Sequence, residues 1–313
     1  MQLYKSRDFG AYFQDTFQFI RRNGKHLFKN YLIVNGIFIL ILMVIGYFFS
    51  KFYTDVVFGG IITNNTNAFD EYINNNAGWF VFLALAFVLI ALISAIISYS
   101  YIPIYLQLYT KHDGKNFNAT DIINSYKTHI GKILIFLVCG ILLVIPVGLV
   151  AGIASFVLAI TIVGLFLIPL VIGAVSLLYQ GALIEYIENR KGIWESFGYS
   201  WTLMGSKFWA AVGCVGLFYL MSYIAQNVVA LIPYFAFIVD LITETQSGVN
   251  PDPQAINKSA SIMMIAIFVL TYLVGTFLNV IVQVNQGVVF YSLKEDNENI
   301  NTKSDIDLIG SGE

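Results

Sequence analysis

The sequence predicts an all-α integral membrane protein with six transmembrane helices. Three observations support this class: only 12% of its 313 residues are charged, 58% are hydrophobic with a mean hydropathy of +0.73, and the charges leave long uncharged runs between them. A soluble domain carries roughly 25% charged residues, because its surface must be hydrated. The composition therefore excludes an ordinary soluble enzyme, and it is too apolar for a disordered chain.

Each expected span is an apolar run long enough to cross a hydrocarbon layer about 30 Å thick, which takes roughly 20 helical residues. The uncharged run 133–184 is too long for one helix and suits two spans joined by a turn near residues 155–164. Pro233 is expected to close the fifth span. The other spans are expected at residues 30–50, about 79–108, 208–232 and 259 to about 291. Residues 51–78 and 233–258, both rich in Asn, then form the larger outer loops.

The distribution of basic residues predicts the orientation. Fifteen of the 17 Lys and Arg residues lie in the N-terminal segment, in the loops after spans two and four, or in the tail, whereas only Lys51 and Lys258 lie on the other side. Because cytoplasmic loops are enriched in Lys and Arg, both termini are expected in the cytoplasm. Abundant Asn and Ile with little Pro is typical of an AT-rich bacterial genome, which predicts the bacterial cytoplasmic (inner) membrane.

Three similar segments precede spans one, three and five and predict an internal repeat. An aromatic residue lies six positions before a lysine in each, in the pairs Phe19 and Lys25, Tyr126 and Lys132, and Trp201 and Lys207. We expect three hairpins, in repeat units of about 9–110, 117–186 and 192–293. The alternative is that any cytoplasmic helix preceding a span is amphipathic and basic. The polar tail, residues 294–313, is expected to be disordered.

Each of these segments is expected to form a separate interfacial amphipathic helix that turns into the membrane at its Gly–Lys or Ser–Lys step. In the first segment the apolar face is Phe9, Phe13, Phe17 and Ile20. Basic side chains beside such a face attract anionic lipid headgroups, although the same charges also serve simply to fix topology. The candidate lipid contacts are Arg21, Arg22, Lys25, Lys29, Lys132 and Lys207.

Span six contains the most informative intramembrane polar residues. Thr276, Asn279, Gln283 and Gln286 recur at three- and four-residue steps, so they share one helical face, and Asn285 lies close to it. Amide side chains in hydrocarbon need hydrogen-bond partners. This face therefore either forms hydrogen bonds with neighbouring helices or lines a ligand cavity. At the end of span four, Glu185 is expected to pair with Arg190 or Lys191, and a proton-coupling role is the less favoured alternative.

A resemblance to a known family rests on two features. One is the segment Glu195-Ser196-Phe197-Gly198-Tyr199-Ser200-Trp201 followed by Lys207-Phe208-Trp209, and the other is the hairpin containing Pro146 and Pro169. The arrangement resembles the membrane-domain superfamily of glycerophosphodiester phosphodiesterases and related bacterial six-span families. The resemblance implies the architecture, and it implies no hydrolase activity because the chain has no room for a catalytic barrel.

The sequence provides no catalytic constellation, metal-ligand spacing or cofactor motif, so no catalytic residue, metal or cofactor is expected. The first functional hypothesis is a non-enzymatic scaffold, an accessory subunit of a membrane protein complex, or an organiser of the lipid environment. The alternative is a carrier that moves a small or amphiphilic solute past the polar face of span six. A lipid-modifying enzyme is the least favoured hypothesis. Membrane lipids and another membrane protein are the expected partners, and nucleic acid is not.

Overall fold

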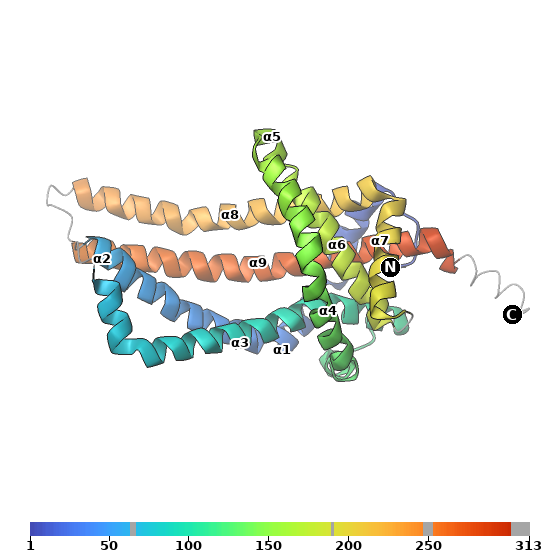
Figure 1. Cartoon of the computed structure of the whole chain (residues 1–313), viewed down its shortest axis with the longest axis horizontal. Coiled ribbons are helices and arrows are strands. Elements are labelled where there is room, and N and C mark those ends of the chain that lie inside the picture. Colours follow the sequence, from blue (N-terminus) through green and yellow to red (C-terminus); the bar gives the residue numbers. More distant parts are fainter. Residues whose placement is uncertain (63–66, 189–190, 247–252, 302–313) are drawn as a thin grey trace, which may run out of the picture. The chain divides into compact units, whose positions relative to one another are not determined.

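The computed structural model describes residues 1–62, 67–188, 191–246 and 253–301, and this part of the chain is helical throughout its regular structure (Figure 1). Six stretches of it are long and apolar enough to span a membrane, which confirms the predicted class. The long helices are α1 (Phe9–Phe52), α3 (Ala68–Lys111), α4 (Ala119–Ala159), α6 (Ile168–Ile187), α8 (Phe208–Gln246) and α9 (Pro253–Glu298). The shorter ones are the π-helix η1 (Tyr53–Phe58), α2 (Gly59–Ile62), α5 (Ile162–Leu165) and α7 (Ile193–Ser206).

Several helices continue beyond the limits that the sequence predicts. Pro233 does not end the fifth span, because α8 runs through it to Gln246. A proline removes one backbone donor and fixes φ near its helical value, and a membrane helix tolerates that loss where leaving the helix would expose more unpaired groups. Much of the two expected outer loops is helical, because η1, α2 and the start of α3 lie in the first and parts of α8 and α9 lie in the second. With 44 residues, α1 is about 66 Å long and extends well past a hydrocarbon core of about 30 Å.

The predicted interfacial helices differ from the observed elements in two of three cases. A separate helix, α7, precedes only α8, and the chain leaves helical geometry at Lys207 (φ −137°, ψ 47°). By contrast, α1 passes through Gly24 and Lys25, and α4 passes through Gly131 and Lys132, without interruption. A glycine inside a helix costs only about 1 kcal/mol, which the continuous backbone ladder offsets.

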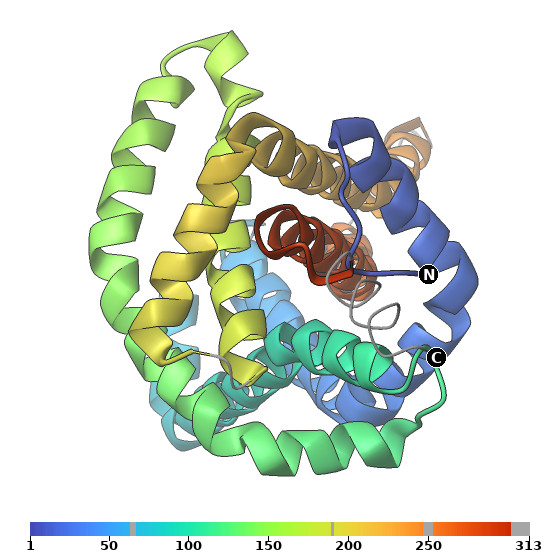
Figure 2. The same ribbon diagram turned by 90° about the vertical axis from the view of Figure 1, so that its right-hand side faces the viewer.

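The chain divides into two compact units. Unit 1 comprises residues 1–34, 96–222 and the C-terminal residues from 278, and unit 2 comprises residues 35–95 and 223–277. In unit 1, α4 and α6 form a hairpin, and α7 lies against α6 (Figure 2). The hairpin turns at α5, where the Thr161 hydroxyl accepts a hydrogen bond from the Gly164 amide at 2.9 Å. A Cβ at Gly164 would lie 1.9 Å from the Leu158 carbonyl oxygen, so this turn requires glycine.

The last third of α9 is the centre of unit 1. Every residue from 282 to 295 is buried, and Figure 2 shows this part of α9 surrounded by segments of the other helices of the unit. A helix buried on all sides has no lipid-facing stripe, so its polar residues must find partners inside the protein.

Unit 2 is formed by the remaining parts of α1, α3, α8 and α9, together with η1 and α2. Its contacts are largely aromatic, with the Phe49 ring 5.6 Å from Phe87 and the Phe52 ring 5.0 Å from Phe80. The Ser94 hydroxyl also donates to the Asn35 side-chain oxygen at 3.2 Å. Outward-facing apolar side chains such as Leu85 are more than half exposed, as suits a surface in contact with lipid.

Candidate functional site

The buried polar core of unit 1 is organised around two neighbouring amides on α9. Asn285 is fully buried and donates to the Thr16 hydroxyl on α1 at 3.0 Å and to the Cys214 sulfur on α8 at 3.3 Å. Gln286 donates to the Ser176 hydroxyl on α6 at 2.9 Å and lies 3.4 Å from the Tyr219 hydroxyl on α8. These contacts join three helices to the central one.

The predicted polar face of span six is only partly gathered in this core. Gln283 and Gln286 are buried in unit 1, whereas Asn279 is exposed, and the Thr276 hydroxyl in unit 2 bonds the Tyr272 carbonyl of its own helix at 2.8 Å. Asn285, which the sequence placed only beside this face, carries more of the interhelical contacts. The three- and four-residue spacing identifies a common face, but it does not reveal which part of a long helix is enclosed.

Several buried amides in the described residues retain unpaired atoms, and in unit 1 they include the Asn285 side-chain oxygen and the Asn23 side-chain nitrogen. The Gln283 side-chain oxygen and both side-chain polar atoms of Gln180 have no hydrogen-bond partner in the described part of the chain. Because an unpaired buried amide costs about 1–3 kcal/mol, most buried amides have protein or water partners. Gln180, with both polar atoms unpaired, is therefore the side chain in the core best able to bind a polar ligand or water.

A buried ion cluster lies where α9 continues beyond the predicted span. The Lys294 ammonium group pairs with Glu185, and both side chains have no exposed surface. It also lies 3.0 Å from a Glu188 carboxylate oxygen, and the Tyr291 hydroxyl donates to Glu188 at 2.7 Å.

This cluster corrects two expectations. Glu185 pairs with Lys294 rather than with Lys191, whose ammonium group lies 3.7 Å from the Tyr199 ring centroid, and Arg190 lies outside the described residues. The expected disordered tail also begins too early, because α9 remains helical to Glu298. Charge neutralisation by two carboxylates is what allows Lys294 to be buried in a helix.

An exposed basic face lies on the first part of α1. We define the basic face as Arg21, Arg22, Lys25 and Lys29, which are all exposed and have no ion-pair partner among the described residues. At 3.6 residues per turn these four positions fall within about 100° of arc. The side of the helix turned away from them is buried, and it includes Tyr12, Thr16, Phe19, Asn23 and Leu27.

This burial pattern corrects the apolar face predicted for the segment. Phe9 and Phe17 are 43% and 41% exposed, so neither is enclosed, and only Phe17, one turn before Arg21, borders the basic face. Phe17 nonetheless stacks on Phe218 of α8, with centroids 5.4 Å apart. An aromatic edge beside a cationic face is the combination found where a helix meets lipid headgroups.

The other two candidate lipid contacts have partners inside the protein. Lys132 donates to the Tyr186 carbonyl at 2.7 Å and lies over the Tyr186 ring. Lys207 pairs with Asp296 at 2.7 Å and donates to the Arg7 carbonyl at 3.3 Å. Both ammonium groups are therefore less available to a headgroup than those of the basic face.

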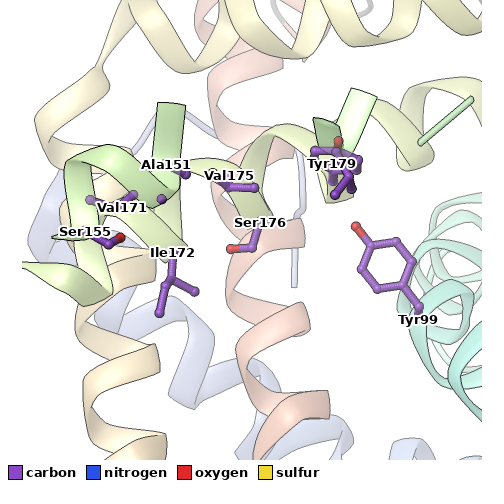
Figure 3. A pocket seen from close by; sticks show the side chains of 10 residues that line it. Tyr99, Ala151, Ser155, Val171, Ile172, Val175, Ser176 and Tyr179 are labelled. Carbon is purple, nitrogen blue, oxygen red and sulfur yellow. The ribbon is translucent and has the colours of Figure 1, made fainter. Parts of the chain in front are cut away.

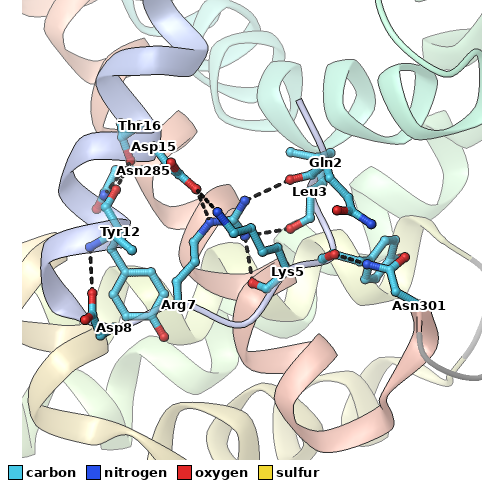
Figure 4. Close-up of polar contacts among 12 residues, drawn as sticks. Gln2, Leu3, Lys5, Arg7, Asp8, Tyr12, Asp15, Thr16, Asn285 and Asn301 are labelled. Atoms are coloured by element: carbon cyan, nitrogen blue, oxygen red, sulfur yellow. Dashed lines mark hydrogen bonds and ion pairs between the residues drawn. The ribbon is translucent and has the colours of Figure 1, made fainter.

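The N-terminal residues are fixed to unit 1 by one buried guanidinium (Figure 4). Arg7 pairs with Asp15 at 2.7 Å and donates to the carbonyls of Gln2, Leu3 and Lys5 at 2.7–2.9 Å. At the other end of this segment the Met1 amine donates to the Tyr109 hydroxyl at 3.0 Å. The segment is therefore part of the folded unit and leads directly into α1.

Comparison of the chain with protein-family models, curated proteins and solved structures found no match. The resemblance to the phosphodiesterase membrane domains thus stays a prediction. No group of three or more His, Cys, Asp or Glu side chains in the described residues is placed to hold a metal ion.

Proposed function

We propose that this chain is a non-enzymatic protein of the bacterial cytoplasmic membrane that organises its lipid environment by holding anionic headgroups against the basic face. In this proposal both termini lie in the cytoplasm, and the architecture follows that of the phosphodiesterase membrane domains. The observation that carries it is the set of four exposed cations on one side of α1, without ion-pair partners in the described residues.

The four cations of the basic face are attracted more strongly to an anionic lipid headgroup than to bulk water. A Lys or Arg close to an anionic membrane surface contributes about 1 kcal/mol of attraction. Four such residues on one face therefore suffice for a marked preference for anionic over zwitterionic lipid. Phe17, one turn before Arg21, would sit beside the headgroups at the level of the lipid interface. Charges that serve only to orient the chain need no such grouping, because the positive-inside rule depends on their number in a loop.

The test is a comparison of the lipids that purify with matched variants. Arg21→Gln with Arg22→Gln removes two charges from the basic face, whereas Lys111→Gln with Lys127→Gln removes two exposed charges elsewhere. The ratio of anionic to zwitterionic lipid retained in mild detergent should fall severalfold in the first variant only, up to about 30-fold for about 2 kcal/mol. Equal retention in both variants would remove the basis of the proposal.

A carrier for a small or amphiphilic solute is the second candidate. It is favoured by the unpaired amide atoms of Gln283 and Gln180 in the core. If they contact a transported solute, Gln283→Leu should abolish uptake while leaving thermal stability in detergent unchanged. If they are packing elements, the same variant should change stability. A scaffold or accessory role predicts instead that a specific membrane protein co-purifies with the chain.

A further inference from the structure

An apolar groove opens between α4 and α6 in unit 1, with Tyr99 of α3 on its third side (Figure 3). Its volume is about 470 Å³, which falls within the range of small-molecule sites. We call this hollow the α4–α6 groove. Its lining is formed by Tyr99, Val144, Ala151, Gly152, Ser155, Val171, Ile172, Val175, Ser176 and Tyr179.

The groove is hollow because α4 carries small residues there. A Cβ added at Gly152 would meet no heavy atom within 4 Å, and the neighbouring residue is Ala151. The rest of the wall consists of valine and isoleucine side chains together with a few hydroxyl groups, and it includes no charged residue. The occupant must therefore be predominantly apolar and uncharged at this point.

The hydroxyl groups that line the groove differ in whether they already take part in a hydrogen bond. The Tyr179 hydroxyl donates to the Gly140 carbonyl at 3.2 Å, and the Ser176 hydroxyl accepts from Gln286 and donates to the Gly173 carbonyl. No hydrogen bond joins the Tyr99 hydroxyl to another residue in the described ranges, and Figure 3 shows it directed toward Ser176 and Tyr179. Tyr99 thus offers one donor to a ligand at the edge of an apolar space.

The position of the groove determines where its occupant comes from. The α4 and α6 parts of the wall lie within the uncharged run 133–184, and Ile172 and Val144 at the rim are about half exposed. In a protein whose apolar helices span a bilayer, this rim faces hydrocarbon. A soluble metabolite would have to enter through lipid, whereas a lipid chain is already present at high concentration.

We propose that the α4–α6 groove binds the acyl chain of a membrane glycerolipid, with a lipid ester carbonyl accepting a hydrogen bond from Tyr99. This site is separate in sequence and position from the basic face, so it goes beyond the proposed function and does not depend on it. A carbonyl oxygen is the acceptor that an uncharged ligand segment next to an acyl chain supplies.

The experiment uses a phosphatidylcholine with a photoactivatable diazirine in its acyl chain, incorporated into bilayer discs with the full chain. Labelled peptides are identified by mass spectrometry. Labelling should concentrate on the groove segments of α4 and α6, and Gly152→Phe should reduce it roughly tenfold by filling the hollow. Ile153→Phe, which changes an exposed side chain on the opposite side of α4 from the groove, should leave it unchanged. Tyr99→Phe should reduce it roughly threefold, through loss of one hydrogen bond.

Three results would overturn the proposal. Labelling spread evenly over the exposed face of α4 would identify ordinary surrounding lipid, and equal labelling of the Gly152→Phe and Ile153→Phe variants would exclude the groove. Protection of the groove by a second copy of the chain, seen as a cross-linked dimer, would make it a protein interface. Ala151→Leu serves as a milder groove variant if Gly152→Phe fails to fold. Because neutral lipid is the probe, loss of anionic-lipid preference at the basic face would leave these results unchanged.

Discussion

Lys294 and Glu185 form an ion pair in which neither side chain has any exposed surface, although they are 109 positions apart in the chain. The pair joins the end of α9 to the end of α6, and Glu188 and Tyr291 complete its surroundings. An unpaired charge in such a place is far more costly than the pair. The cluster therefore fixes which helix ends meet in unit 1.

Removing one member of this pair should destabilise the protein strongly. Lys294→Met leaves two buried carboxylates without their cation, and we expect a loss of about 3–5 kcal/mol in the free energy of unfolding. Thermal or denaturant unfolding in detergent measures this loss. The double variant Lys294→Met with Glu185→Leu should recover part of it, since Glu188 keeps its hydrogen bond from Tyr291. A single variant as stable as the wild type would show that the pair is not buried inside the protein.

Replacement of the interhelical amide Asn285 should lower stability more than replacement of the exposed amide Asn279. Asn285→Leu removes the hydrogen bonds to Thr16 and Cys214 and should lower stability by roughly 0.6–1.7 kcal/mol. Asn279→Leu is the matched control, because the same substitution at an exposed position of the same helix should change stability by less than about 0.5 kcal/mol. Unfolding in detergent measures both values. The reverse order of effects would contradict the enclosed position of Asn285.

Two basic residues that contact the same carboxylate should differ in their contribution. Arg7 is buried and bonds Asp15 and three carbonyls, whereas Lys5 is 56% exposed and 3.8 Å from Asp15. Arg7→Lys cannot reproduce the planar set of donors and should cost about 1.5–3 kcal/mol, while Lys5→Met should cost less than about 1 kcal/mol. Differential scanning fluorimetry of the purified variants compares them, and equal effects would refute a fixed N-terminal segment.

Cysteine accessibility tests the orientation on which the proposed function depends. In a chain with Cys139 and Cys214 replaced by alanine, Lys111→Cys should react only with a reagent applied from the cytoplasmic side, and Asn67→Cys only with one applied from outside. Both positions are exposed. Labelling on the opposite sides would reverse the topology and separate the basic face from the cytoplasmic leaflet.

The sequence was sufficient for the class of fold and for the turn between spans three and four, because a bilayer imposes uncharged runs of a minimum length. It failed where packing decides the outcome. Lys294 resembled the start of a polar tail because its acidic partners lie far away in the chain, and Pro233 resembled a helix end although α8 continues past it. Spacing also suggested Asn279 as a buried amide, since a period of 3.6 residues identifies a face but not the depth of its burial.

The most direct test of the central proposal is stabilisation of the purified protein by added anionic lipid. Unfolding temperatures are measured in detergent while phosphatidylglycerol or phosphatidylcholine is added, for the wild type and for Arg21→Gln with Arg22→Gln, Lys25→Gln and Lys29→Gln. Binding to the native state alone raises stability by about 2.7 kcal/mol at a hundredfold excess over Kd. The proposal predicts that phosphatidylglycerol stabilises the wild type more than phosphatidylcholine does, that salt weakens this difference, and that the fourfold variant abolishes it. An unchanged difference in the fourfold variant would contradict the proposal.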